Sequence, residues 1–402
     1  MSPHDLINLF ISSQYIGVVF FVLLPIFLIY LIIILWQYVK QIEFIKNIEW
    51  VLFEIKLPRE ITKSPQAMEI VLTALHQTNE GTWFSKLTKG DIRPWFSLEL
   101  VSNGGRIRFY IRTSIKFKNL IESQIYSQYS EVEIMEVADY TLEIPYALNN
   151  SDWDLAAFEF ELTKEDPYPI KTYIDYGMDK NPEEEEKIDP MTPVLELLGS
   201  LKPGEQMWFQ YLVMAAKSRY AMPGSWKKED WVKQANQIIK TKIADTKTED
   251  RPRGDMNLLT PGEKKVIESI ERSVGKLGFD CGIRTLYLAK KDIFDKANFG
   301  SMASVMKQYN SAEANGFRPS KSTAIKYPWQ DITGKKESRL KWQMFDAYRR
   351  RAYFYGIYKK RPFVLNSEEL ATIYHFPGGV AQTPTFERIE SRRGEPPANL
   401  PL

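Results

Sequence analysis

The longest apolar run of the chain lies near its amino terminus. Residues 15–36 are almost all apolar, and none of them is charged. A helix of this length crosses the roughly 30 Å hydrocarbon core of a bilayer, and a membrane helix tolerates an internal proline such as Pro25. Tyr15 and Trp36 lie where aromatic residues gather at the two membrane surfaces. The pattern predicts a transmembrane anchor within residues 1–40.

A cleaved signal peptide is the alternative for this segment. Such a peptide begins with basic residues and ends at small residues before its cleavage site. This chain begins Met-Ser-Pro-His-Asp, and its apolar run ends in Ile-Leu-Trp-Gln-Tyr, which favours a retained anchor. Lys40, Lys46, Lys56 and Arg59 follow the run, whereas no Lys or Arg precedes it. The distribution of positive charge therefore predicts a single-pass protein with its carboxy-terminal bulk in the cytoplasm.

Alternation of apolar and polar residues predicts a compact unit over residues 48–145. A strong hairpin turn, Ser-Asn-Gly-Gly, occupies residues 102–105. The expected strands are residues 50–57, 95–101, 106–113 and 132–137, and the expected helices begin at Pro65 and at Lys116. The order β-α-β-β-α-β is the ferredoxin-like arrangement.

A second, similar unit is expected over residues 152–334. Its predicted strands are residues 157–163, 206–216 and 281–289, with helices at residues 192–201 and 294–310. Two further helices, about residues 228–244 and 261–277, form an insertion between the last two strands. The predicted fold class is therefore α+β, with a transmembrane helix followed by two ferredoxin-like units, the second carrying a helical insertion.

Residues 335–402 differ in character from the rest of the chain. Residues 335–361 hold ten Lys or Arg and two acids, interleaved with aromatic residues. Basic residues neutralise phosphates and aromatic rings stack on bases, so this segment is a candidate for contact with nucleic acid or lipid. The favoured alternative is a helix whose aromatic residues pack on the second unit while its charges stay solvated. The candidate contact residues are Lys341, Arg349, Arg350, Arg351, Lys359, Lys360 and Arg361.

The segment that follows has the pattern of a short strand and a capped helix. Residues 363–365 suit an edge strand, and Asn366-Ser-Glu-Glu369 has the form of a capping box. The helix ends before Pro377, and the Pro-rich residues beyond it suit an interaction segment. The candidate residues for docking a partner are Glu369, Tyr374, His375 and Phe376.

Composition limits the chemistry that the chain can perform. Lys and Arg total 53 against 51 Asp and Glu in 402 residues, a balance that argues against a surface built wholly for nucleic acid. Cys281 is the only cysteine and the three histidines lie far apart, so neither an intramolecular disulfide nor a structural zinc site is expected. A phosphate-binding G-x-x-x-x-G-K-[ST] motif and a G-x-S-x-G nucleophile elbow are both missing. We expect a non-enzymatic protein without a cofactor.

Five stretches carry a resemblance to a known family, namely residues 52–59, 97–112, 122–129, 363–377 and 396–400. They resemble the region preceding the motor in conjugative DNA-transfer ATPases of bacterial type IV secretion systems, of the FtsK/HerA-like class. In that family the ATPase domain follows the Pro-Pro-x-Asn-Leu segment, whereas this sequence ends at Leu402. The resemblance implies a platform in the bacterial inner membrane whose motor is a separate chain. A split or truncated reading frame is the alternative.

Three hypotheses follow for the function. The first is a scaffold of a transfer system that docks a separate P-loop ATPase through residues 363–402. The second is a membrane-tethered protein that binds DNA through residues 335–361. The third is an assembly protein that forms homo-oligomers through its sheet edges.

Overall fold

A computed structural model describes residues 3–58, 63–146, 152–179, 188–220, 228–245, 259–325 and 327–378; for residues 3–20 and for Pro328 it describes the backbone alone. The chain forms two compact units. The smaller, here the anchor unit, comprises Met1–Ile48, Asn79–Arg93 and Tyr355–Ile357. The larger, the sheet unit, comprises Glu49–Thr78, Pro94–Phe354 and Tyr358–Leu402.

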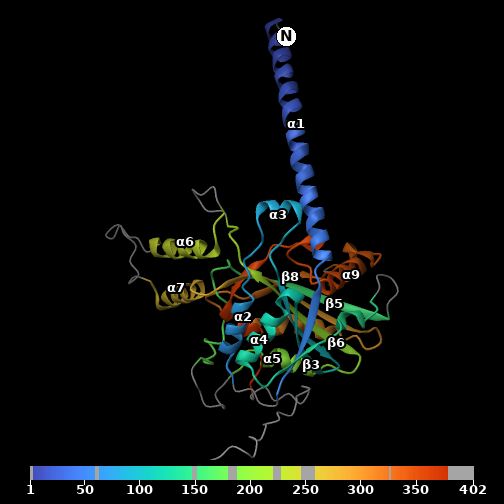
Figure 1. The fold of residues 1–402 in the computed structure, drawn as a ribbon, viewed down its shortest axis with the longest axis vertical. Coiled ribbons are helices and arrows are strands. Elements are labelled where there is room, and N and C mark those ends of the chain that lie inside the picture. Colours follow the sequence, from blue (N-terminus) through green and yellow to red (C-terminus); the bar gives the residue numbers. More distant parts are fainter. Residues whose placement is uncertain are drawn as a thin grey trace, which may run out of the picture. The chain divides into compact units, whose positions relative to one another are not determined.

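The anchor unit consists of two helices and two short connecting segments. Helix α1 (Pro3–Lys46) contains Pro25, and its portion Phe21–Lys46 is long and apolar enough to cross a membrane. Helix α3 (Trp83–Thr88) lies beside the carboxy-terminal part of α1 (Figure 1). No helix is predicted between the helix that begins at Pro65 and the strand at residues 95–101, but Thr82 caps a helical turn by accepting the Ser85 N–H at 3.2 Å.

The sheet unit is built on one antiparallel sheet with the strand order β4-β1-β3-β2-β6-β7-β5-β8. In its first half the order β4-β1-β3-β2 is that of a ferredoxin-like fold, with antiparallel neighbours. Gly104 and Gly105 both take positive φ angles in the hairpin turn, as a two-residue turn of this type requires. The elements are β1 (Trp50–Lys56), α2 (Pro65–Ala74), β2 (Phe96–Asn103), β3 (Arg106–Ser114), α4 (Lys118–Gln128) and β4 (Glu133–Glu136).

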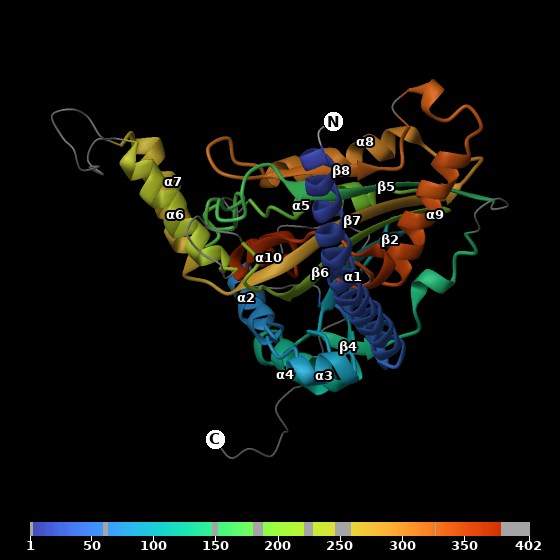
Figure 2. The ribbon, with the colours of Figure 1, turned by 90° about the horizontal axis from the view of Figure 1, so that it is seen from above.

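The second half repeats the same order, as β8-β5-β7-β6. Helices α6 (Trp231–Ala244) and α7 (Pro261–Val274) form the predicted insertion between β6 and β7, and Figures 1 and 2 show them side by side. The other elements are β5 (Trp153–Leu162), α5 (Thr192–Gly199), β6 (Glu205–Ala215), β7 (Gly278–Lys290), α8 (Lys296–Ser304) and β8 (Phe317–Ser322). The predicted α+β class with two ferredoxin-like halves is thus confirmed.

Strands β2 and β6 join the two halves. They occupy equivalent places in the two repeats and pair in antiparallel fashion, with Glu99 opposite Gln210. Pairing between equivalent antiparallel strands relates the two halves by an approximate two-fold axis. The two units that the sequence suggests therefore share one continuous sheet and one compact body.

Residues 335–354 and 358–378 complete the sheet unit on both faces. Helix α9 (Lys335–Arg349) packs Met344, Phe345 and Tyr348 on one face of the sheet, against Trp208. Strand β9 (Phe363–Asn366) pairs with β7, and α10 (Ser367–Ile373) packs on the other face beside α2. Short 3₁₀ turns occupy Ile115–Phe117, Tyr140–Leu142, Val305–Tyr309, Pro328–Gln330 and Gly356–Tyr358.

Candidate functional sites: the anchor and two buried charge networks

The predicted anchor residues belong to one continuous helix. Pro25 lies inside α1 without interrupting it. Trp36 is exposed, its indole N–H donates to the Leu87 carbonyl at 2.9 Å, and the Lys40 ammonium lies 5.3 Å from its ring centre. Tyr15 lies in the part of α1 whose side chains are outside the described residues. The apolar residues from Phe21 to Val39 are exposed or nearly so, as a helix in lipid requires.

Most of the predicted basic contact residues already have acidic partners. Lys341 pairs with Asp154 at 2.7 Å and with Glu337 at 2.8 Å. Arg349 and Arg350 both pair with Asp346, at 3.4 Å and 2.8 Å. The pair with Asp154 joins α9 to β5, whereas the pairs with Glu337 and Asp346 are local to α9 and its carboxy-terminal turn. The aromatic side of α9 packs on the sheet, as the favoured alternative expects.

Three further candidate residues follow α9, and one of them is ion-paired. Lys360 pairs with Glu159, whereas Lys359 and Arg361 are exposed and form no ion pair with another described residue. Of the seven predicted contact residues, only Lys359 and Arg361 therefore keep a charge that no described acid pairs.

Arg351 lies at the centre of the first buried charge network. It is 0% exposed, as is Glu99 on β2. Its Nε and Nη2 donate to the two carboxylate oxygens of Glu99 at 2.8 Å and 3.0 Å, and it also pairs with Asp139. Burial acts to raise the pKa of Glu99, but the charge and hydrogen bonds of Arg351 outweigh it and leave that pKa below its usual value. The pair is a buried, bidentate ion pair.

Hydroxyl and amide donors complete the coordination of Glu99. Tyr140 donates to it at 2.7 Å, and the Gln210 amide donates at 3.2 Å. The Gln210 oxygen in turn accepts from Arg284, which is fully buried and pairs with Glu159 at 3.0 Å. The strand register places these groups in one row across the sheet, because Glu99, Gln210, Arg284 and Glu159 face one another on adjacent strands.

Arg351 also has an unusual backbone conformation. Its φ of 50° makes it the one non-glycine residue with positive φ among those that the structure describes. The left-handed region costs an L-residue about 1–2 kcal/mol. The side-chain ion pairs, together with the bond from the Trp95 indole to the Arg351 carbonyl at 3.2 Å, hold the residue there. The sequence pattern marked Arg351 only as one of the basic candidate contact residues, and it gave no prediction for Glu99.

The four predicted docking residues lie in the interior. Glu369, Tyr374, His375 and Phe376 are each at most 1% exposed, so they cannot form a docking surface in this structure. The Tyr374 hydroxyl donates to the Tyr110 carbonyl at 3.1 Å. The prediction that a partner contacts these four side chains is wrong. Strand β9 and the sheet cover this face of α10, so its side chains are part of the interior.

Aromatic and polar contacts account for the burial of the last two docking candidates. The Phe376 ring packs edge-on against Phe109, with ring centres 5.5 Å apart. His375 Nδ1 lies 2.8 Å from the Ala371 carbonyl, and Nε2 lies 3.3 Å from Asp189. Phe376 therefore packs the end of α10 on the sheet, and His375 joins it to the segment that precedes α5.

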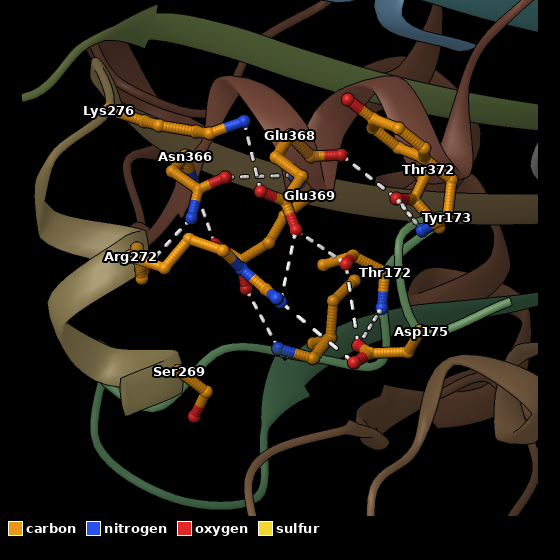
Figure 3. Close-up of polar contacts among 12 residues, drawn as sticks. Thr172, Tyr173, Asp175, Ser269, Arg272, Lys276, Asn366, Glu368, Glu369 and Thr372 are labelled. Atoms are coloured by element: carbon orange, nitrogen blue, oxygen red, sulfur yellow. Dashed lines mark hydrogen bonds and ion pairs between the residues drawn. The ribbon is translucent and has the colours of Figure 1, made fainter. Parts of the chain in front are cut away.

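The predicted capping box at the start of α10 is confirmed and belongs to the second buried network (Figure 3). Glu369 accepts the backbone N–H of Asn366 at 2.8 Å and of Ile170 at 2.9 Å. Burial raises the pKa of Glu369 to about 8, although these two donors act in the opposite direction. Glu369 thus joins α10 to the segment that precedes α5.

Two cations from α7 and its carboxy-terminal turn balance the acids of this network. Lys276 lies 2.9 Å from Glu368 and 2.8 Å from Glu69 on α2 (Figure 3 draws the first contact). Arg272 lies 3.3 Å from Glu368, which also accepts a hydrogen bond from the Thr172 hydroxyl. Arg272 also lies 3.9 Å from Asp175, so the two cations face three carboxylates and leave no charge to balance Glu369, which agrees with its raised pKa.

Both networks have the composition of structural clamps. Their acids are paired with Arg or Lys, or accept several hydrogen bonds, so each ionised group is held by the chain itself. Within the described residues, no group of three or more His, Cys, Asp or Glu side chains is placed to hold a metal ion. Cys281 is a free, buried thiol.

The fold and these networks define a class of protein: a doubled ferredoxin-like sheet, closed by its own carboxy-terminal segment and carrying an amino-terminal helix fit to cross a membrane. The chain belongs to the family described as Domain of unknown function (DUF8128), whose family model matches residues 37–388. The match covers the whole sheet unit as far as α10 and begins at the last turns of α1. No curated protein matches the sequence.

Proposed function

We propose that this protein is a non-catalytic platform, anchored in the bacterial inner membrane by α1, that docks a separate P-loop ATPase of a transfer system similar to type IV secretion. The observation that carries the proposal is the exposed apolar helix attached to a body whose buried charges are committed to holding its own elements together. The resemblance to the region preceding the motor of conjugative ATPases supports the choice of partner.

Charge and thiol chemistry support a cytoplasmic sheet unit. Lys40 and Lys46 follow the apolar run within α1, on the side that the positive-inside rule assigns to the cytoplasm. The free thiol of Cys281 fits a reducing compartment.

The docking segment follows α10. Strand β9 and helix α10 are built into the sheet unit, so their side chains are not free to bind a partner. We assign partner binding to residues 379–402, which lie outside the described residues and contain the Pro-Pro-Ala-Asn-Leu stretch of the resemblance.

A pull-down from native membranes tests the proposal. The bait is the tagged full-length chain, compared with a chain ending at Gly378, which keeps β9 and α10 and therefore leaves the buried core intact. We expect a P-loop ATPase with the full-length bait and its loss with the shortened one. Recovery with both baits would move the docking surface onto the sheet unit, and recovery with neither would refute the platform hypothesis.

DNA binding remains the second candidate function because of one observation. Lys359 and Arg361 are exposed, close in sequence and not ion-paired with any described residue. Their small number predicts weak binding with a shallow dependence on salt.

A further inference from the structure

The first ferredoxin-like half contains an addition that the second half lacks. In the second half, α5 connects to β6 through residues 200–204. The equivalent connection in the first half, from α2 to β2, takes residues 75–95 and contains α3. Most of this connection, Asn79–Arg93, belongs to the anchor unit together with α1. The sheet fold does not require the addition, since the other half closes without it.

The addition is folded on itself and against α1. Glu80 joins its two ends by pairing with Lys86 at 2.6 Å and with Arg93 at 3.3 Å. The Arg93 N–H donates to the Tyr355 hydroxyl at 3.1 Å, which fastens residues 355–357 to the same unit. These contacts give the addition a defined shape.

The backbone of the addition touches α1 where the apolar run ends. Trp36 donates to the Leu87 carbonyl at 2.9 Å. At Gly90, whose φ is +78°, a Cβ would lie 2.3 Å from the Lys40 carbonyl oxygen, so only glycine permits this approach. Lys40 is the first charged residue after the apolar run. The addition therefore lies at the level where a spanning α1 passes from hydrocarbon to water.

Large apolar side chains project from this level into solvent. Trp83 is 74% exposed, Phe84 62% and Ile357 72%. On α3, Trp83, Phe84 and Leu87 share one side by their i, i+3 and i, i+4 spacing, whereas Lys86 and Lys89 lie on the other. Tryptophan and phenylalanine opposite lysines are the composition of a segment that lies in the headgroup region of a bilayer.

We propose that Trp83 and Phe84 of α3, with Ile357, insert into the lipid headgroup layer beside α1, so that the anchor unit binds the membrane surface as well as crossing it. The occupant is lipid because the exposed apolar surface continues directly from the exposed face of α1. The inference rests on the anchoring proposed above and adds a second contact that fixes the depth of the span.

Depth-dependent fluorescence quenching tests the proposal in the full-length chain reconstituted into nanodiscs of phosphatidylcholine and phosphatidylglycerol. Single cysteines are introduced by Phe84→Cys and Trp83→Cys on the apolar side, by Lys89→Cys on the opposite side, and by Ile29→Cys within the span. Each is labelled with a thiol-reactive nitrobenzoxadiazole. Cys281 is buried and burial raises the pKa of its thiol, so the unsubstituted chain shows the background labelling.

We expect labels at residues 83 and 84 to be quenched several-fold more than the label at residue 89 by a nitroxide near the lipid headgroup. The label at residue 29 should respond most to a nitroxide deep in the acyl chains. Equal, weak quenching at residues 84 and 89 with strong quenching at residue 29 would overturn the inference and leave the anchor intact. Failure of residue 29 to respond would overturn the anchor itself.

A water-soluble quencher separates lipid from a protein occupant. Iodide should reach the label at residue 89 and be excluded from residues 83 and 84. Exclusion of iodide without quenching by lipid nitroxides would show a protein covering α3, and would refute the lipid contact.

Discussion

Replacement of Arg351 by alanine should be among the most damaging single changes in the sheet unit. The side chain is 0% exposed and supplies the only cation within ion-pair distance of Glu99 among the described residues, itself 0% exposed. Its loss leaves a buried carboxylate with hydroxyl and amide donors but no opposite charge. Breaking a buried pair in this way costs about 3–5 kcal/mol.

Arg350 is a matched control one position away. It also forms an ion pair, with Asp346 at 2.8 Å, but its side chain is 60% exposed. An exposed pair contributes about 0–1 kcal/mol. Arg350→Ala should therefore lower the free energy of unfolding by at most about 1 kcal/mol, although residue type, substitution and local sequence are the same.

The backbone supplies a second comparison at the same position. Because Arg351 has a φ of 50°, alanine retains the strain of the left-handed region and glycine does not. Arg351→Gly should be less destabilising than Arg351→Ala by about 1 kcal/mol, the reverse of the usual order for these residues.

Guanidinium unfolding of the full-length chain in detergent micelles, followed by far-ultraviolet circular dichroism, measures all three variants. The midpoint and slope give the free energy of unfolding of the sheet unit. Equal losses for Arg351→Ala and Arg350→Ala would refute the account of the buried pair. A larger loss for Arg351→Gly than for Arg351→Ala would refute the account of the backbone.

Three further predictions concern other parts of the chain. The pKa of Glu369 is about 8 in the folded state and about 4.3 in the unfolded state, so its contribution to stability is complete below a pH of about 4.3 and is lost as pH rises toward 8. Glu369→Gln should therefore flatten the fall of the unfolding midpoint with pH between these limits. The same fall in the variant and in the unsubstituted chain would contradict this prediction. Gly90→Ala should abolish hydrogen-exchange protection in α3. Gly177 also has a positive φ, of +76°, but a Cβ there would meet nothing within 4 Å, so Gly177→Ala should alter exchange only slightly in its own segment. Equal effects of the two substitutions would argue against the close approach of Gly90 to α1. If the chain binds DNA, Lys359→Ala with Arg361→Ala should abolish electrophoretic retardation of a short duplex at low salt, and undiminished binding would place the contact elsewhere.

Local patterns predicted the elements whose formation depends on nearby residues. The repeat of apolar positions marks most strands and helices, and the capping box at Asn366 and Glu369 marks the start of α10. These signals act within a few residues, so they can be recognised without knowing the fold. The apolar length of α1 is of the same kind.

Elements with weak local signals were missed. Strand β8 is polar, contains Pro319 and lies at the edge of the sheet, where a proline leaves no ladder hydrogen bond unmade. Helix α3 is only one and a half turns long, and its apolar side faces solvent. The cap at Thr82 and the spacing of Trp83 and Leu87 were the available signals.

What the sequence by itself determined is the fold class, the order of elements in the first ferredoxin-like half, the helical insertion of the second half and the apolar helix fit to cross a membrane. Only the tertiary structure decided which charges are free. Arg350 and Arg351 are identical and adjacent in sequence, yet one is on the surface and the other is the centre of a buried network. Burial depends on strands that are distant in the chain, such as β2 with Glu99, and the free energy of an ion pair depends on that burial more than on the residues that form it.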